Sequence, residues 1–245
     1  MRNVWIIARR EFIAFFATPI AYVVAAFILL VVGIIFSFSV YFGSQQPGYP
    51  PPGMDQVVSV IAPLLIWSLP AITMRLLANE TRLGTIELLL TAPVRDWEVV
   101  VGKWLGAFLF VLSIIAITFV YPIFMNIMTD PGIDQGLIVS GYLGLFLLSA
   151  ALVAIGVMVS SLFESQVATL VTTLGAFIVA WFLLTPIASL GNPTLSNIIS
   201  YIDIRENFLS MVNGSIQLSS MIFFISTTVL FLVLGTFSLE SRRWR

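Results

Sequence analysis

Long apolar segments alternate with short polar ones along the whole chain. The apolar segments cover about residues 20–42, 57–77, 99–128, 136–162, 167–190 and 218–239. An α-helix rises about 1.5 Å per residue, so about 20 residues cross a hydrocarbon core of about 30 Å. The pattern predicts an all-α polytopic membrane protein, in which residues 1–245 form a single transmembrane domain with six spans.

Prolines and short connections predict how these spans are shaped. The second span contains Pro63 and Pro70, and each proline removes a backbone hydrogen bond, so we expect this helix to be kinked or partly broken. The third span carries Pro122 near its far end. Only residues 163–166 separate the fourth span from the fifth, which predicts a tight antiparallel hairpin.

Two further segments have mixed polarity. Residues 1–18 combine basic and aromatic side chains, and a helical wheel gathers most of the apolar ones on one side. This pattern predicts an interfacial helix in the headgroup layer, and the alternative is an ordinary basic flank. Its candidate interfacial residues are Arg2, Trp5, Arg9 and Arg10. Residues 194–216 are semi-polar, which predicts short helices at the outer surface or dipping into it.

The composition agrees with a lipid environment and narrows the chemistry. The chain is 59% hydrophobic and 9% charged, whereas a soluble domain carries roughly a quarter charged residues. It has no cysteine and no histidine, which excludes disulfides, thiolate or imidazole metal sites and Cys-His or Ser-His catalysis. No ionisable residue lies near the middle of a predicted span, which disfavours a proton-coupled or sodium-coupled carrier.

The basic residues fall almost entirely on one side of the predicted membrane. The side of the N-terminus holds Arg2, Arg9, Arg10, Arg75, Arg82, Arg95, Lys103, Arg242, Arg243 and Arg245. The other side holds Arg205 alone. By the positive-inside rule, both termini and the loop 78–98 are expected in the cytoplasm. The expected location is the inner membrane of a bacterial cell.

The loop 78–98 is the densest cluster of charge between the termini. A helix over 83–91 would place Gly84, Glu87 and Thr91 on one face and apolar residues on another, so it could dock on a cytoplasmic partner. The alternative is a solvated loop. Beyond it, Gly102 and Lys103 resemble the end of a phosphate-binding loop, but Trp97 and Trp104 occupy positions where that loop needs Gly and Ser or Thr. The chain is therefore not expected to hydrolyse ATP.

Small residues four apart occur at Gly102 and Gly106 and again at Ser140 and Gly144. This spacing lets two helices approach closely. The sequence leaves open whether the second helix belongs to the same chain or to a partner.

The segment from Glu80 to Pro93, followed by Gly102 and Lys103, resembles the signature between the second and third spans of ABC-2 type transporter permeases. Residues 70–75, the phrase 87–93 and the ending 239–244 resemble most closely the gliding-motility-type (GldF-like) branch. The resemblance implies a type V exporter-like fold. Residues 83–91 would be the coupling helix, residues 3–16 the connecting helix, and residues 194–216 outer re-entrant helices.

The same resemblance implies where an ATPase subunit would bind. The expected contact residues are Glu80, Arg82, Gly84, Thr85, Glu87, Thr91 and Arg95. Asn79 precedes Glu80 where many relatives carry two consecutive acids, so it is open whether Glu80 alone suffices for that contact.

The expected function is thus that of a permease subunit of an ATP-driven ABC exporter. Its partners would be a cytoplasmic ABC ATPase that binds ATP and Mg, a second permease chain in a homodimer or heterodimer, and the bilayer. An extracytoplasmic accessory protein is a further possible partner, and no nucleic acid is expected to bind. The alternatives are a membrane scaffold that recruits a cytoplasmic protein, and a carrier or channel that works alone. Polar residues in the spans are too scattered to define a substrate: Tyr41, Thr118, Tyr121, Asn126, Thr172, Thr173 and Thr185.

Overall fold

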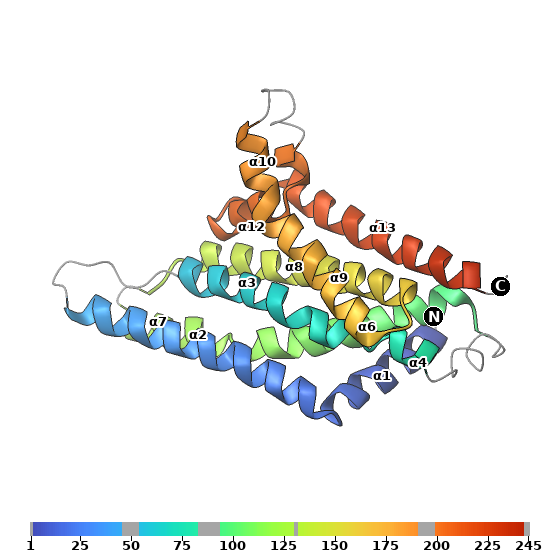
Figure 1. The fold of residues 1–245 in the computed structure, drawn as a ribbon. Coiled ribbons are helices and arrows are strands. Elements are labelled where there is room, and N and C mark those ends of the chain that lie inside the picture. The colour runs from blue at the N-terminus through green and yellow to red at the C-terminus, as the bar shows by residue number, and fades with distance from the viewer. Residues whose placement is uncertain (1, 46–53, 83–93, 130–131, 191–198, 243–245) are drawn as a thin grey trace.

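The computed structural model describes residues 2–45, 54–82, 94–129, 132–190 and 199–242, which form helices and no strand (Figure 1). The longer helices are α1 (Arg2–Phe16), α2 (Pro19–Gln45), α3 (Met54–Thr73), α6 (Asp96–Ile117), α8 (Gln135–Leu162), α9 (Gln166–Ile178) and α13 (Leu218–Arg242). The shorter ones are α4 (Ala78–Arg82), α7 (Val120–Met128), the π-helix η1 (Val179–Leu183), α10 (Leu184–Leu190) and α12 (Ile204–Val212).

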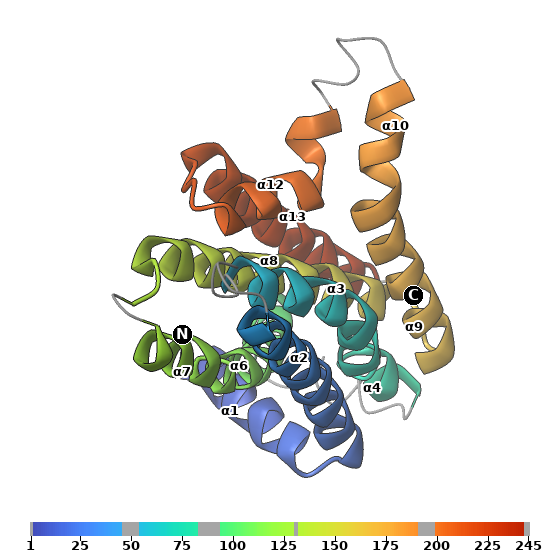
Figure 2. The same cartoon turned by 90° about the vertical axis from the view of Figure 1, so that its left-hand side faces the viewer.

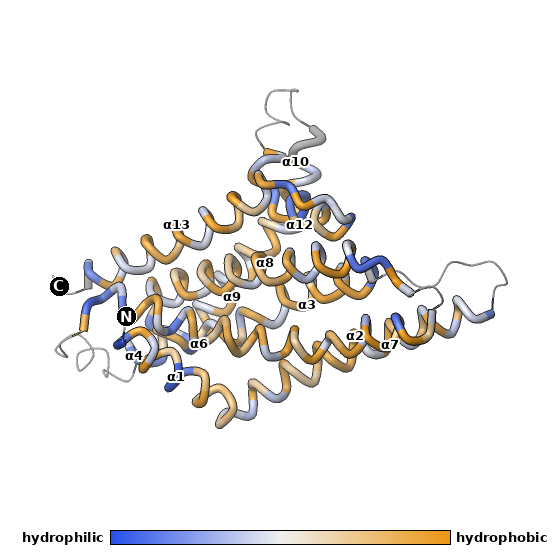
Figure 3. Tube along the Cα trace, turned by 180° about the vertical axis from the view of Figure 1, so that it is seen from behind, coloured by the Kyte–Doolittle hydropathy of each residue, from blue (hydrophilic) through white to orange (hydrophobic). Residues whose placement is uncertain are grey.

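Six helical stretches of the described chain are long and apolar enough to cross a membrane, which confirms the predicted all-α polytopic fold class. They are Pro19–Gln45, Asp55–Arg82, Asp96–Met128, Gln135–Leu162, Gln166–Ile187 and Leu218–Ser241. Apolar residues run along the middle of these helices, and polar residues gather toward the ends and around α12 (Figure 3). The start of α1, the helix α4 and the end of α13 lie at the same end of the bundle (Figure 1); this end is called the terminal end below.

Helix α8 is the centre of the bundle, because α3, α6, α9, α12 and α13 all pack against it. Small side chains allow this crowding. A Cβ atom added to Gly156 would lie 2.5 Å from the hydroxyl of Thr73 on α3, and one added to Gly144 would lie 3.2 Å from the side chain of Met211 on α12. Ser140, four residues before Gly144, is fully buried. The Ser140–Gly144 spacing therefore serves packing within the chain.

Helix α3 continues through both of its prolines, Pro63 and Pro70. The second span was expected to be kinked or partly broken, and it is not broken at these two prolines. The interruption comes later, in the turn between Thr73 and Ala78, where the amide of Leu76 donates to the carbonyl of Thr73 at 3.1 Å. Helix α3 is packed against α2, α8 and α9, an environment in which membrane helices tolerate proline.

The third span is divided into α6 and α7 at Thr118 and Phe119. Pro122 has no amide hydrogen, so the carbonyl of Thr118, four residues earlier, lacks its usual helical donor. That carbonyl instead accepts hydrogen bonds from the amide of Tyr121 at 3.1 Å and from the hydroxyl of Tyr142 on α8 at 3.0 Å. The proline thus breaks the helix one turn before its own position.

The fifth span leaves the bundle as it crosses. It begins at Gln166, four residues after the end of α8 at Leu162, and α9, η1 and α10 then lean away from the other helices (Figure 2). The π-helical turn of η1 places Trp181 against Phe208 of α12, with ring centroids 5.8 Å apart. Of the semi-polar segment, α12 is a short helix packed on α8, and residues 191–198 lie outside the described part of the chain.

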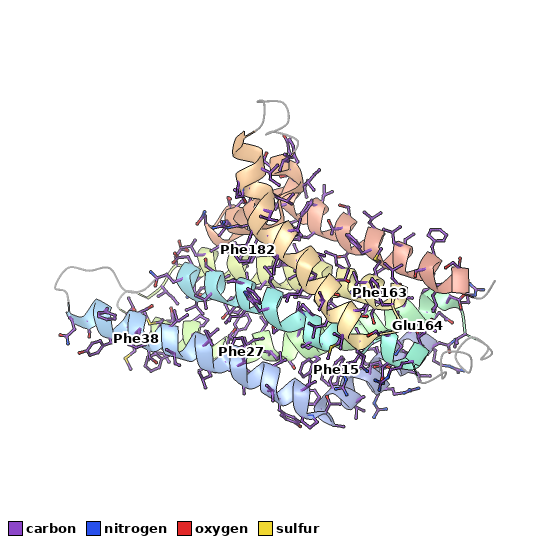
Figure 4. All side chains as sticks on the ribbon, in the orientation of Figure 1. Phe15, Phe27, Phe38, Phe163, Glu164 and Phe182 are labelled. Carbon is purple, nitrogen blue, oxygen red and sulfur yellow. The ribbon has the colours of Figure 1, made fainter. Side chains whose placement is uncertain are left out.

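The outer faces of α2 and α13 are apolar and exposed, as lipid-facing or partner-facing surfaces are. Phe27 and Phe38, both labelled on α2 in Figure 4, are 47% and 57% exposed. On α13, Val229 and Phe237 are exposed in the same way.

Candidate functional site

The charged segment at the terminal end begins with α4, whose first turn is fixed by a side chain from another helix. The hydroxyl of Ser160 on α8 accepts hydrogen bonds from the amides of Leu77 and Ala78, each at 3.0 Å. An N-cap normally comes from the residue that precedes the helix, but here α8 supplies it. The side-chain nitrogen Nε2 of Gln166, at the start of α9, also donates to the side-chain oxygen of Asn79 at 2.7 Å. Helix α4 is therefore bound to both α8 and α9.

A buried lysine joins α4 to two further helices. The ammonium nitrogen of Lys103 on α6 lies 2.9 Å from a carboxylate oxygen of Glu11 on α1 and 2.8 Å from one of Glu80 on α4. Lys103 is only 2% exposed. A buried ammonium group requires partners of this kind, because removal from water is otherwise too costly. We call Lys103, Glu11 and Glu80 the lysine cluster.

Two glycines of α6 make room for α1 beside the lysine cluster. A Cβ atom added to Gly102 would lie 2.8 Å from the Cβ of Ile7, and one added to Gly106 would lie 2.7 Å from the Cβ of Glu11 and 2.8 Å from the carbonyl oxygen of Ala8. Any larger residue would push the two helices apart. The Gly102–Gly106 spacing therefore also serves packing within the chain, between α1 and α6.

The far end of the charged segment is fixed by a second polar cluster. The carboxylate of Glu98 accepts a hydrogen bond from the backbone amide of Arg95 at 3.0 Å and another from the side chain of Asn3 on α1 at 3.1 Å. Glu98 thus satisfies one of the free amides at the start of α6 and holds the beginning of α1 against it.

The residues predicted to contact an ATPase divide into three groups. Gly84, Thr85, Glu87 and Thr91, with the rest of the predicted coupling helix, lie outside the described residues. Arg82 and Arg95 are exposed at the terminal end, on either side of that segment. Glu80 turns one carboxylate oxygen toward Lys103. Through Lys103 the structure brings Glu80 together with α1 and α6.

The segment predicted as an interfacial helix forms the helix α1, and its exposed residues include all four candidates: Arg2, Trp5, Arg9 and Arg10. Its opposite face is buried against α6, with Ala8 fully enclosed and Phe15 stacked on Phe110 at a centroid distance of 5.1 Å.

Several residues of this site had no signal in the sequence. Glu11, Asn3, Ser160 and Gln166 are single polar residues in apolar or mixed segments, and their partners lie tens of residues away. Lys103 was recognisable as a basic residue at the start of a span and as part of the family signature, but its pairing with Glu11 and Glu80 was not.

The polar residues of the spans do not come together as a binding site. Thr118 and Tyr142 bond to each other at the break between α6 and α7, and Thr185 donates to the buried carboxylate of Asp203 at 2.6 Å. Tyr41 is exposed on α2. Among the described residues, no group of three or more acidic side chains could hold a metal ion.

Comparison with known protein families gives one result. A family model described as ABC-2 family transporter protein matches residues 45–244. A comparison with curated proteins finds no match.

Proposed function

Because the chain belongs to the ABC-2 family of transporter proteins, and is therefore a membrane permease component of an ABC transporter, we propose that it works as an exporter driven by a separate cytoplasmic ATPase. The proposal includes a pair of permease chains and the gliding-motility-type branch that the sequence resembles. The ATPase would bind ATP and Mg, and this chain would supply the membrane path.

The observation that carries the proposal is the lysine cluster. Lys103 connects α4, which leads into the predicted coupling helix, with α1 and α6 over distances of 2.8–2.9 Å. Ser160 connects the same helix to the central α8. A displacement of the charged loop would therefore be transmitted through α4 to α1, α6 and α8 together.

This arrangement suggests how ATP would drive transport. When the ATPase closes on ATP, it presses on residues 83–91, and α4 transmits the displacement through Lys103 to α1 and α6 and through Ser160 to α8. Each bundle then tilts as a body about the interface between the two permease chains. ATP shifts the equilibrium because the closed ATPase binds one tilt of the bundles better than the other.

The location belongs to the proposal as well. The terminal end, with its exposed arginines, would face the cytoplasm of a bacterial cell, and the start of α3 would face outward.

The function is tested by purifying the tagged chain from its own membranes in mild detergent. We expect an ATPase subunit to co-purify, and ATP hydrolysis to be sensitive to vanadate. The variant Glu87→Arg should remain in the membrane but lose the coupling of hydrolysis to transport. Glu240→Arg reverses an exposed charge at the terminal end, outside the charged loop, and should behave as the unchanged protein does.

The scaffold hypothesis predicts a different result. A scaffold would recruit a cytoplasmic protein without ATP turnover, so recovery of the chain with no ATPase, even after crosslinking through residues 83–91, would refute the transporter proposal. Coupled activity at the normal level in Glu87→Arg would remove Glu87 from the mechanism.

A further inference from the structure

A cavity of about 160 Å³ lies beside the lysine cluster, where the end of α1 meets the turn after α3. Its polar lining consists of Glu11, Thr18, Arg75 and Asn79, and its apolar lining consists of Ala14, Phe15 and Leu76. A bulk water molecule occupies about 30 Å³, so the cavity has room for roughly five waters or for a polar group of similar size.

Arg75 is the unusual member of this lining. It is partly buried, yet no described residue makes a hydrogen bond or ion pair with its guanidinium group. Of the nearby acids, Glu11 and Glu80 each turn one carboxylate oxygen toward Lys103. The guanidinium group of Arg75 is therefore available to a ligand, and its planar donors match the geometry of a phosphate or a carboxylate.

The other polar groups of the cavity extend this match. The side-chain oxygen of Asn79 accepts from Gln166, so its NH₂ group is left to donate. The hydroxyl of Thr18 donates to the carbonyl of Phe15 at 2.9 Å and retains acceptor capacity. The carboxylate of Glu11 lines the same cavity, and it favours a positive group. The cavity therefore offers donors for an anion and an acceptor for a cation.

The position of the cavity identifies the source of such a group. Phe15, labelled in Figure 4, lines it from α1, and the next residue, Phe16, has its ring 6.5 Å from that of Tyr22 on α2. Trp5, Phe16 and Tyr22 are 59%, 41% and 58% exposed. Exposed aromatic side chains beside an amphipathic helix are typical of the headgroup layer of a membrane. A phosphate at this depth is carried by a phospholipid.

We propose that this cavity binds the headgroup of an ethanolamine phospholipid from the leaflet at the terminal end. Arg75 and Asn79 bind the phosphate, Glu11 binds the ammonium group, and the acyl chains lie along the exposed apolar faces of α1 and α2. Glu11 belongs both to this cavity and to the lysine cluster, so the bound lipid steadies the contact of α1 with α4. The proposal concerns lipid binding alone and stands whether or not the exporter assignment is correct.

The test uses the full chain in mild detergent, stripped of lipid and titrated with short-chain phosphatidylethanolamine, short-chain phosphatidylglycerol and inorganic phosphate. Native mass spectrometry counts the bound lipids, and the melting temperature reports the effect of binding. We expect one tightly bound phosphatidylethanolamine per chain that raises the melting temperature. We also expect affinity for phosphatidylglycerol to be lower by about tenfold, because it lacks the ammonium group that Glu11 would bind.

The variant Arg75→Ala should lose about tenfold or more in affinity for phosphatidylethanolamine. Arg205→Ala removes an exposed arginine of α12 outside the cavity and should keep the wild-type affinity. Arg75→Lys keeps the charge without the planar donors and should lie between them, which separates loss of binding from loss of folding.

Four outcomes would overturn the proposal. Arg75→Ala could lower the melting temperature equally with and without lipid, which would make Arg75 a simple counter-charge for the nearby acids. Arg75→Ala could also bind phosphatidylethanolamine as tightly as the unchanged chain. Phosphatidylglycerol could bind at least as tightly, which would exclude the ammonium contact. Inorganic phosphate could compete at equal concentration, which would indicate a soluble ligand.

Discussion

The hydroxyl of Tyr142 donates a hydrogen bond of 3.0 Å to the carbonyl oxygen of Thr118, the acceptor that Pro122 leaves without its helical amide. Both residues are buried, and Phe119 stacks on the ring of Tyr142 with a centroid distance of 4.0 Å. The break in the third span is therefore supported by α8, and its position depends on a side chain 24 residues away from Thr118.

Tyr142→Phe should destabilise this break. The carbonyl of Thr118 keeps its bond to the amide of Tyr121, so we expect a loss of about 1 kcal/mol rather than the larger cost of a wholly unsatisfied buried group. The measurement is thermal unfolding in mild detergent. Tyr41→Phe, on the exposed face of α2, is the matched control and should leave the unfolding temperature unchanged. Equal unfolding temperatures for the two variants would contradict the structural role of Tyr142.

Lys103→Met should be strongly destabilising. It leaves the carboxylates of Glu11 and Glu80 facing each other without the ammonium group between them. Removal of one partner from a buried ion pair costs about 3–5 kcal/mol. Lys103→Arg keeps the charge and should lose less. Equal unfolding temperatures for Lys103→Met and Lys103→Arg would show that the positive charge of Lys103 does not stabilise the cluster.

Gly106→Ala should loosen α1 from α6, because the new Cβ would lie 2.7 Å from the Cβ of Glu11. Overpacking of this kind costs about 1–3 kcal/mol. Gly175→Ala is the matched control, since a Cβ there meets no atom within 4 Å. In that helix, alanine should stabilise by up to about 1 kcal/mol. The two substitutions are therefore predicted to shift the unfolding temperature in opposite directions, and a shift in the same direction would argue against the tight α1–α6 contact.

The proposed orientation can be measured with single cysteines, because the chain has none of its own. Ser44→Cys and Ser215→Cys should react with a membrane-impermeant maleimide in intact cells. Thr85→Cys should react only after permeabilisation. Labelling of Thr85→Cys in intact cells would reverse the proposed topology.

The spans were predictable because each is a continuous apolar run that is longer than the apolar stretch of a helix in a soluble core. The break in the third span was within reach of the sequence, since Pro122 identifies the carbonyl four residues earlier that loses its donor. Pro63 and Pro70, in contrast, lie inside α3 without breaking it. Other helices surround α3, and a sequence does not show which prolines have such neighbours.

The candidate site was predictable only in part, and for a physical reason. The spacing of Gly102 and Gly106 shows that some helix approaches closely, but identical spacing serves contacts within a chain and between chains. Glu11 is 92 residues from Lys103, and Glu80 is 23 residues from it. Pairing over such separations follows from the tertiary packing and has no local pattern.

The charged loop is held to the bundle at both ends. Ser160 fixes the helix that enters it, and Glu98 with Asn3 fixes the helix that leaves it. If the loop binds an ATPase as proposed, both contacts would pass its displacement to the bundle, one through α8 and the other through α1. The coupling of the proposed transporter would then depend on buried polar residues that never touch the ATPase.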